Sequence, residues 1–312
     1  MNEREWLEYL KKYLYEKPPV IATYNEDATV IEIKENHYLL LTTDSLVEGI
    51  HFDLAYFDFY SLGVKLAASN LSDIAAMGGW PKWALLTLGS PKPIDPSFID
   101  PFMEGLVSTL EKYSAYLTGG DTVRSPFFFF SLTLVGETEK PLLRKGAKKG
   151  DYLFVSRALG GSSAFLRWIR EKPLDQIPEN LKKAHLRPEP EIELGLFLRN
   201  IASSAIDISD GLLLDLSRLC LASQISAEIE EEKIPLEEGA TLEEALSGGE
   251  DYALLFTIPE KNLSYLTKIN KKIFYLGRII EGVGEILFLT KKGERKSLPP
   301  KGFDHFTFLL QS

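Results

Sequence analysis

The first half of the chain alternates short apolar, β-branched segments with longer segments whose apolar residues have helical spacing. Two strand-like segments on either side of Lys34-Glu35-Asn36 predict a β-hairpin. A helix that ends at Gly78-Gly79 follows, because glycines commonly terminate helices. Asp95 is a candidate cap for a second helix. Helices are predicted over residues 61–77 and 97–113, and strands over residues 29–33, 38–43, 83–88 and 127–135.

The segment 140–150 is rich in Lys, Gly and Pro, which is typical of a linker. Beyond it strands and helices alternate again, which indicates a second unit built in the same style. Strands are predicted over residues 152–156, 205–208, 252–257, 274–279 and 286–289, with helices after Gly160-Gly161 and over 212–222. The simplest interpretation is an α/β (α+β) protein with two domains, residues 1–138 and 139–312.

Composition excludes several classes of protein. The 312-residue chain has a formal net charge of -10, which argues against a nucleic-acid partner. An acidic protein that binds phosphates needs cations to mediate the contact. The single cysteine, Cys220, allows neither an internal disulfide nor a cysteine-based zinc site. Acidic residues interrupt the N-terminus and no apolar run reaches the ~18 residues of a membrane span, so no membrane association and a cytoplasmic location are expected.

One pattern recurs along the chain: an apolar, strand-like segment runs into small or hydroxyl residues and then into an aspartate. It occurs at Asp44, at Asp121 and at Asp210, and Asp27 lies just before the first predicted strand. Because strand ends present side chains to ligands from a rigid scaffold, these acids are candidates for one common site. For each acid alone, a structural role as a turn or helix-cap residue is the simpler interpretation.

Asp73 is the most informative acid, because it lies inside the apolar helix predicted over residues 61–77. A buried carboxylate needs a partner, and the nearby sequence offers only Lys65 and side-chain hydroxyls. A metal ion would satisfy it and would also reduce the repulsion between converging carboxylates. Oxygen ligands of this kind suit magnesium better than zinc.

Three glycine pairs are weaker candidates for phosphate binding, since their backbone N–H groups could cradle oxygens or could simply turn the chain. They are Gly119-Gly120, Gly160-Gly161 and Gly248-Gly249. The chain has no Walker A loop, dinucleotide-binding fingerprint or protein-kinase signature, so any ATP would be bound by another architecture. His51 follows Asp44 closely and either faces the same site or is an ordinary strand or loop histidine.

Five motifs, in family order, resemble the signature of thiamine monophosphate kinases, a family of the aminoimidazole-ribonucleotide-synthetase-like superfamily. They lie at residues 42–52, 70–78, 119–122, 206–212 and 248–252. The resemblance implies two α/β domains, each a mixed sheet covered by helices, and a homodimer formed through the N-terminal domain. It also implies ATP-dependent phosphorylation of thiamine monophosphate to thiamine diphosphate, by in-line transfer with several magnesium ions. We expect the dimer contact at residues 127–130.

The resemblance also implies roles for individual residues. Magnesium ligands are expected at Asp27, Thr42, Thr43, Asp44, Asp73, Asp121, Asp207 and Asp210, with catalysis resting on Asp44, Asp73, Asp121 and Asp210. The nucleotide would contact Gly119, Gly120, Arg144 and Ser209, and thiamine phosphate would contact His51, Glu250 and Phe303. In this view residues 1–138 dimerise and bind metal and ATP, and residues 139–312 complete both substrate sites. The chain departs from the family's Gly-Asp-Asp pattern at Asn25-Glu26-Asp27, which leaves the role of Glu26 open.

Two alternatives remain at this point. The first is a sister enzyme of the same superfamily, such as aminoimidazole ribonucleotide synthetase, selenide-water dikinase or a hydrogenase-maturation dehydratase. The dikinase calls for a reactive cysteine near the N-terminus and the dehydratase for a C-terminal cysteine, and the sequence has neither. The second is a catalytically silent nucleotide- or metal-binding protein, which would have no reason to keep so many acids together.

Overall fold

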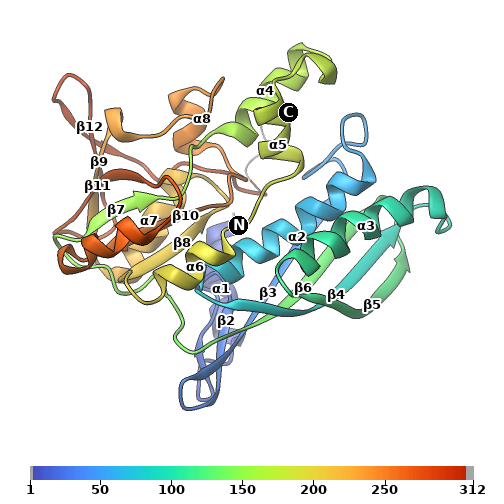
Figure 1. The fold of residues 1–312 in the computed structure, drawn as a ribbon, viewed down its shortest axis with the longest axis horizontal. Coiled ribbons are helices and arrows are strands. Elements are labelled where there is room, and N and C mark those ends of the chain that lie inside the picture. Colours follow the sequence, from blue (N-terminus) through green and yellow to red (C-terminus); the bar gives the residue numbers. More distant parts are fainter. Residues whose placement is uncertain (1–2, 307–312) are drawn as a thin grey trace.

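The computed structural model describes residues 3–306 and contains two mixed sheets, one from each half of the chain (Figure 1). The N-terminal sheet has six strands in the order β1-β2-β3-β6-β4-β5, all neighbours being antiparallel except the parallel pair β4 and β5. Its strands are β1 (Val20–Ala22), β2 (Thr29–Lys34), β3 (His37–Val47), β4 (Trp80–Ser90), β5 (Tyr116–Arg124) and β6 (Phe129–Thr138).

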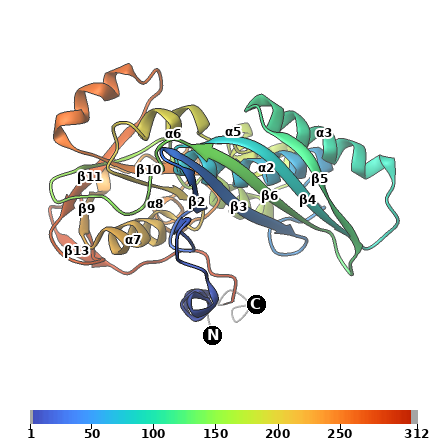
Figure 2. The ribbon, with the colours of Figure 1, turned by 90° about the horizontal axis from the view of Figure 1, so that it is seen from below.

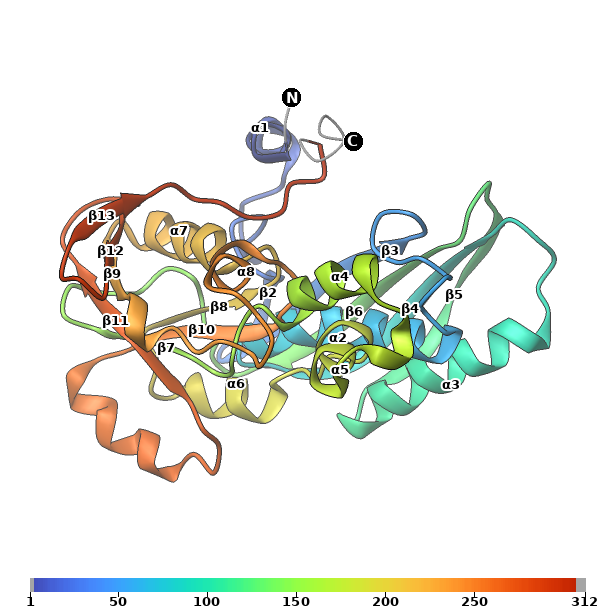
Figure 3. The same ribbon diagram turned by 90° about the horizontal axis from the view of Figure 1, so that it is seen from above.

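Two long helices, α2 (Phe59–Ala76) and α3 (Pro96–Lys112), lie on one face of this sheet (Figure 1). The predicted hairpin is confirmed as β2 and β3, and the predicted cap is confirmed because the Asp95 carboxylate accepts from the Ser97 backbone N–H at 2.8 Å. Figure 2, seen from below, looks onto the opposite face of the sheet, which no helix within residues 3–306 covers. A shorter helix, α1 (Glu3–Leu10), lies beside the last described segment of the chain (Figures 2 and 3).

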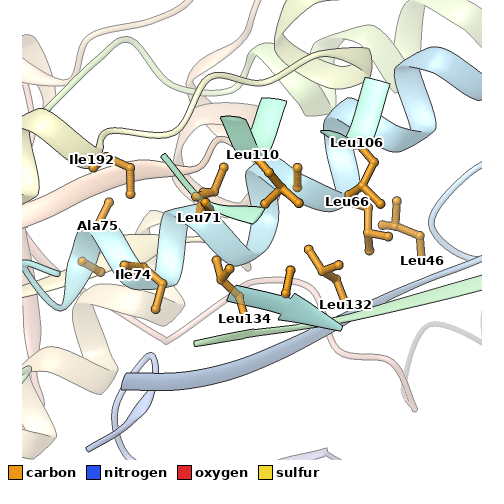
Figure 4. Packing of buried hydrophobic residues seen from close by; sticks show 14 of the residues in the cluster. Leu46, Leu66, Leu71, Ile74, Ala75, Leu106, Leu110, Leu132, Leu134 and Ile192 are labelled. Atoms are coloured by element: carbon orange, nitrogen blue, oxygen red, sulfur yellow. The ribbon is translucent and has the colours of Figure 1, made fainter. Parts of the chain in front are cut away.

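Helix α2 is buried along most of its length, which explains the nearly continuous apolar sequence around Asp73. In Figure 4, Leu66 and Leu71 of this helix lie between Leu132 of β6 and Leu110 of α3. Such a helix has no solvated face, so its polar side chains must find partners inside the protein. The few polar residues of α2 are therefore candidates for a built site.

The C-terminal sheet has seven strands in the order β13-β12-β9-β11-β7-β10-β8, antiparallel except for the parallel pair β12 and β9. Its strands are β7 (Tyr152–Val155), β8 (Ser204–Ile208), β9 (Ser226–Glu230), β10 (Ala253–Ile258), β11 (Phe274–Ile280), β12 (Ile286–Leu289) and β13 (Arg295–Leu298). Its helices are α4 (Gly161–Glu171), α5 (Glu179–Leu186), α6 (Ile192–Leu198), α7 (Leu212–Ser223) and α8 (Leu242–Ser247). Short 3₁₀ helices complete the fold at Lys11–Tyr13, Leu174–Gln176, Glu231–Lys233 and Glu260–Lys268.

The two mixed sheets with their helices confirm the predicted fold class. Helices α4 and α5 of the second half reach over toward the N-terminal sheet (Figure 3), so residues of both halves can meet. The predicted linker is not a free tether: the backbone N–H of Leu142 donates to Met77 at 3.0 Å, and the Ser223 hydroxyl donates to the Arg144 carbonyl at 2.7 Å. Among the described residues, no helix is long and apolar enough to cross a lipid bilayer.

Candidate active site

Three aspartates from separate parts of the chain converge beside α2. Asp27 precedes β2, Asp73 lies on α2 and Asp207 lies on β8, and one carboxylate oxygen of each lies within 4.8 Å of the others. The cluster therefore joins the N-terminal sheet, its central helix and the C-terminal sheet. A residue of β8 can reach it because α2 packs between the two halves of the molecule. The structure thus brings together three of the predicted magnesium ligands.

Strand β3 adds two further predicted ligands from the side of the sheet that faces α2. Thr42 donates its hydroxyl hydrogen bond to the Asp73 carboxylate, and the backbone N–H of Asp44 donates to Asn70 at 3.2 Å. On α2, the Ser72 hydroxyl donates to Asp207 at 2.7 Å. Thr42 and Ser72 therefore orient two of the acids, and Asn70 accepts from the backbone of a third.

The acids carry unfavourable electrostatics when no cation is present. Burial, followed by the charges of Asp44 and Asp207, raises the pKa of Asp73 well above its usual range. Burial, followed by the charge of Asp27, does the same to the pKa of Asp207. Burial also raises the pKa of Asp44 to about 6, with a contribution from Asp210. A divalent cation at this place would stabilise the ionised form of all three acids and would therefore oppose these shifts.

The donor set fits magnesium. Asp27 Oδ2 is buried and has no hydrogen-bond partner among the described residues, so it has a lone pair free for a metal ion. The other ligand atoms at hand are carboxylate oxygens of Asp73 and Asp207 and the hydroxyl of Thr42. Hard oxygen ligands of this kind are what magnesium binds.

Asp210 lies at the end of β8 in the turn before α7, and it does not cap that helix. The Asp215 carboxylate accepts from the backbone N–H groups of Asp210 and Gly211 at 3.0 and 3.1 Å. The Asp210 carboxylate instead accepts from Arg218 at 2.6 Å, and its charge contributes to the raised pKa of Asp44. The structural interpretation of Asp210 as a helix cap is wrong for this reason. Arg218 and Asp215 are partners that sequence reasoning missed.

Arg144 and Glu26 lie side by side at the edge of the cluster. The Arg144 guanidinium forms a salt bridge with Asp27. The Glu26 carboxylate accepts from the Arg144 backbone N–H at 2.7 Å, and burial raises its pKa to about 7. Glu26 thus holds the segment that carries Arg144, which gives this position a structural role. Arg144 lies beside the acids, where its guanidinium group could bind a phosphate.

Four predicted site residues lie elsewhere, on or toward the uncovered face of the N-terminal sheet. Thr43 points to that face, where Thr133 donates to it at 3.3 Å. Asp121 pairs in register with Thr87 and, through β6, with Ser131 on the same face. Asp121, Gly119 and Gly120 all lie inside β5, so the prediction that they follow a strand end is wrong. Their roles as ligands stay predictions.

The close packing of β5 against β4 explains why residue 120 is a glycine. A Cβ atom there would lie 1.8 Å from the Leu86 carbonyl oxygen, and the backbone has a φ of +157°. Only glycine permits this close approach of β5 to β4. The pair Gly119-Gly120 therefore belongs to the sheet, although a ligand could still approach its exposed backbone.

The N-terminus of α4 is closed by the protein itself. The Asp251 carboxylate accepts from the Gly160 backbone N–H at 2.8 Å. Burial raises the pKa of Asp251 to about 7, although this hydrogen bond and further ones to Ser162 and Gly161 oppose the shift. The suggestion that Gly160-Gly161 cradles a phosphate is wrong, because an internal carboxylate already takes that place.

The predicted substrate residues gather near the end of β8. The ring of His51 lies 5.0 Å from that of His305 with a tilt of 53° between the ring planes, and the His305 ring lies 4.8 Å from that of Phe303. The Phe303 backbone N–H donates to the Asp210 carbonyl at 2.9 Å, and the Glu250 backbone N–H donates to the Ser209 carbonyl at 2.7 Å. Ser209 and Asp210, two consecutive residues of one turn, therefore hold the backbones of Glu250 and Phe303.

His51 is held in a single protonation state. Its Nδ1 accepts from the Val47 backbone N–H at 3.1 Å. Burial lowers the pKa of His51 to about 4, so the ring is neutral near neutral pH. A neutral ring that accepts at Nδ1 carries its proton on Nε2 and can donate one hydrogen bond there.

Glu250 has partners that sequence reasoning did not foresee. Lys65 of α2 is fully buried and lies 2.8 Å from Glu250, so it does not neutralise Asp73. His185 of α5 lies 3.4 Å from the other carboxylate oxygen. A lysine inside an apolar helix was a signal that could have been followed, whereas nothing near His185 in the sequence marks it.

Two family models match the chain. The AIR synthase related protein, N-terminal domain, matches residues 25–138, and the C-terminal domain of the same family matches residues 148–290. A thiamine-monophosphate kinase of Haemophilus influenzae is 38% identical over 316 residues, which cover 96% of this chain and 95% of the relative. The enzyme of the same name from Escherichia coli K12 is 37% identical and 90% of each chain is covered.

Several solved structures are also similar to this chain. Thiamine monophosphate kinase from Aquifex aeolicus superposes with a TM-score of 0.81 at 34% identity, covering 95% of this chain and 99% of that one. A structure named AaThiL complexed with AMPPCP and TMP has a TM-score of 0.87 at 35% identity, with 98% and 97% covered. The hydrogenase maturation protein HypE in complex with ATP, at 15% identity and a TM-score of 0.71, shares the fold alone. The chain therefore belongs to the thiamine-monophosphate kinase family, within the AIR synthase related proteins.

Proposed function

We propose that this protein transfers the γ-phosphoryl group of ATP to thiamine monophosphate, giving thiamine diphosphate. The observation that carries the proposal is the convergence of Asp27, Asp73 and Asp207 in a chain of this family. Carboxylates with raised pKa values need cations, and a reaction between two anionic phosphates needs the same cations. The relative named as a complex with AMPPCP, an analogue of ATP, and TMP supports the same pair of substrates.

Several magnesium ions would be held by Asp27, Asp44, Asp73, Asp207 and Asp210. Bound there, they would reduce the repulsion between the two substrates and offset the charge that develops during transfer. Thr42 and Ser72 orient two of these carboxylates by hydrogen bonds. Thr43 and Asp121 stay in the proposed ligand set on the strength of the resemblance, although they lie on the other face of the sheet.

The protein's own residues would align the two phosphates. Arg144, which lies beside Asp27, would contact the nucleotide, together with Ser209 at the turn after β8. His51 Nε2–H and the ring of Phe303 would contact the thiamine phosphate, together with Glu250. Because the backbones of Glu250 and Phe303 are bound to Ser209 and Asp210, the two substrate positions are fixed relative to each other. A phosphate monoester is already ionised near neutral pH, so in-line attack needs no general base.

The function is tested by a coupled ATP assay with thiamine monophosphate and magnesium. We expect thiamine diphosphate to form only with the monophosphate, and not with thiamine or with aminoimidazole ribonucleotide precursors. EDTA should abolish the product and added magnesium should restore it. ATP binding without turnover of any of these compounds would contradict the proposal and would favour a silent binding protein.

We also propose that the protein is a homodimer formed through the uncovered face of the N-terminal sheet. Tyr116, Trp83, Leu85 and Val123 share this face in register, and each is at least 40% exposed. A patch of exposed apolar side chains on a sheet face is typical of an interface between copies. The expected contact at residues 127–130 is wrong for Phe128 and Phe130, which are 3% and 0% exposed because they pack under α2 and α3.

The dimer is tested by changing Leu85→Lys, which places a charge in the centre of the patch. We expect light scattering to give about twice the mass of one chain for the native protein at micromolar concentration. The variant should give the mass of a monomer, because burying an unpaired lysine costs more than a typical interface residue contributes. Val283→Lys, at a 59% exposed position of the C-terminal half, is the matched control and should leave the mass unchanged. A native monomer would contradict the proposed dimer.

A further inference from the structure

Glu250 is the centre of a buried polar network whose other members have no role in the proposed function. Its Oε1 lies 2.8 Å from Lys65 Nζ, and its Oε2 accepts from the Ser162 hydroxyl at 3.3 Å. His185 Nδ1 lies 2.8 Å from the same hydroxyl and 3.4 Å from Oε2. Three of the four residues are almost completely enclosed, and Glu250 alone keeps a side-chain exposure of 23%.

Protonation of the network follows from its geometry. The Lys65 ammonium faces Glu250, and burial together with Lys65 lowers the pKa of His185 to about 4, so the imidazole is neutral. A neutral ring with its proton on Nδ1 donates to the Ser162 oxygen, which leaves the Ser162 hydrogen free to donate to Glu250. One carboxylate oxygen of Glu250 then faces the ammonium group of Lys65, and the other accepts from Ser162.

Aromatic side chains fix the two distant partners. His185 stacks on Phe165 at a centroid distance of 4.7 Å, with 14° between the ring planes. The Lys65 ammonium lies 5.2 Å from the Phe57 ring centroid, and Phe57 also packs on His185 at 5.4 Å. Neither Lys65 nor His185 can move without disturbing this packing, so the network has a defined geometry.

The backbone of Glu250 is fixed as well. It has a φ of +64°, an uncommon conformation for a residue other than glycine, and its N–H is bound to the Ser209 carbonyl. A Cβ on the preceding Gly249 would lie 2.6 Å from that carbonyl oxygen, so only glycine allows the approach. A side chain held in a strained loop and by three partners is typical of a site that requires one orientation.

We propose that Lys65 and His185 are positioning residues that hold the Glu250 carboxylate in the orientation that binds thiamine monophosphate. They come from different halves of the chain, α2 and α5, and meet at Glu250. Lys65 is 0% exposed and His185 is 1% exposed, so neither touches the substrate and both act through Glu250. This inference rests on the proposed function, because it assigns Glu250 to the thiamine phosphate side of the site.

The test is a double-mutant cycle in steady-state kinetics. Lys65→Met should raise KM for thiamine monophosphate at least about tenfold, because one partner of a buried ion pair is removed, while KM for ATP changes less than about threefold. Glu250→Gln should raise the same KM. In the Glu250→Gln background, Lys65→Met should have little further effect, since the two side chains act as one unit.

Controls separate positioning from folding. Lys149→Met removes an exposed ion pair with Glu281 and should leave both KM values unchanged. If Lys65→Met does not fold, His185→Phe keeps the ring stacking and carries the same test, with a smaller rise in KM for thiamine monophosphate alone. Equal changes in both KM values, or additive effects in the double variant, would overturn the proposal. Turnover by the unmodified protein tests the proposed function separately, so the two failures are distinguishable.

Discussion

Asp73→Asn is expected to lower kcat by about 10³-fold or more while leaving the protein folded, which is the largest effect we predict. Asp73 contacts several members of the site. Thr42 donates to its carboxylate, and carboxylate oxygens of Asp27 and Asp207 lie within 4.8 Å of one of its oxygens. Asparagine has the same shape but no charge, so it cannot hold a cation between the other two acids. Measured at saturating ATP and thiamine monophosphate, the loss should appear in kcat.

The substitution Asp73→Asn should lower the activity but should not lower the stability of the metal-free protein. Burial and neighbouring charges raise the pKa of Asp73 in the folded protein, so its ionised form disfavours folding. Removing the charge should therefore raise, or at least maintain, the unfolding temperature of the metal-free protein. Asp175→Asn, at an exposed position in a short 3₁₀ helix, is the matched control and should change neither property. Near-normal kcat for Asp73→Asn would refute the metal cluster.

The sequence was sufficient for the elements whose local pattern is strong. The hairpin of β2 and β3 and the Asp95 cap follow from turn and capping chemistry that depends only on near neighbours. Asp73 was identified because an acid in an apolar helix conflicts with its surroundings, and such conflicts are expected at functional sites. These predictions needed no knowledge of distant parts of the chain.

Other features depend on pairings that no local pattern records. Thr42 and Thr43 are neighbours in sequence, yet successive strand residues point to opposite faces, so only Thr42 reaches Asp73. The face that is buried is the one covered by helix α2, and the pattern of the strand alone does not show which face that is. The partners of Glu250 come from α2 and α5 and could not be assigned from its own neighbourhood. The segment 140–150 has the composition of a linker, and its packing is decided by residues such as Ser223.

Magnesium affinity should rise steeply with pH, by about tenfold or more per unit between pH 5.5 and 7. The direction of this pH dependence follows from the pKa values of the acids. Burial raises the pKa of Asp44 to about 6 and the pKa values of Asp73 and Asp207 well above their usual range. In this window the metal-free site holds protons that the unfolded chain has lost, so metal must displace them and a higher pH favours it. The stability of the metal-free protein should fall over the same window as pH rises.

Thermal unfolding with increasing magnesium at pH 5.5 and pH 8 measures both effects. We expect the rise in unfolding temperature caused by magnesium to be small at pH 5.5 and large at pH 8, because binding to the folded state alone stabilises it. Asp44→Asn should give a shallower dependence on pH, since one of the displaced protons no longer exists. A magnesium effect that is independent of pH, or larger at pH 5.5, would mean that metal binds away from these acids. The charges of the ionised acids would then need a different cation, and Arg144, already paired with Asp27, would be the first to examine.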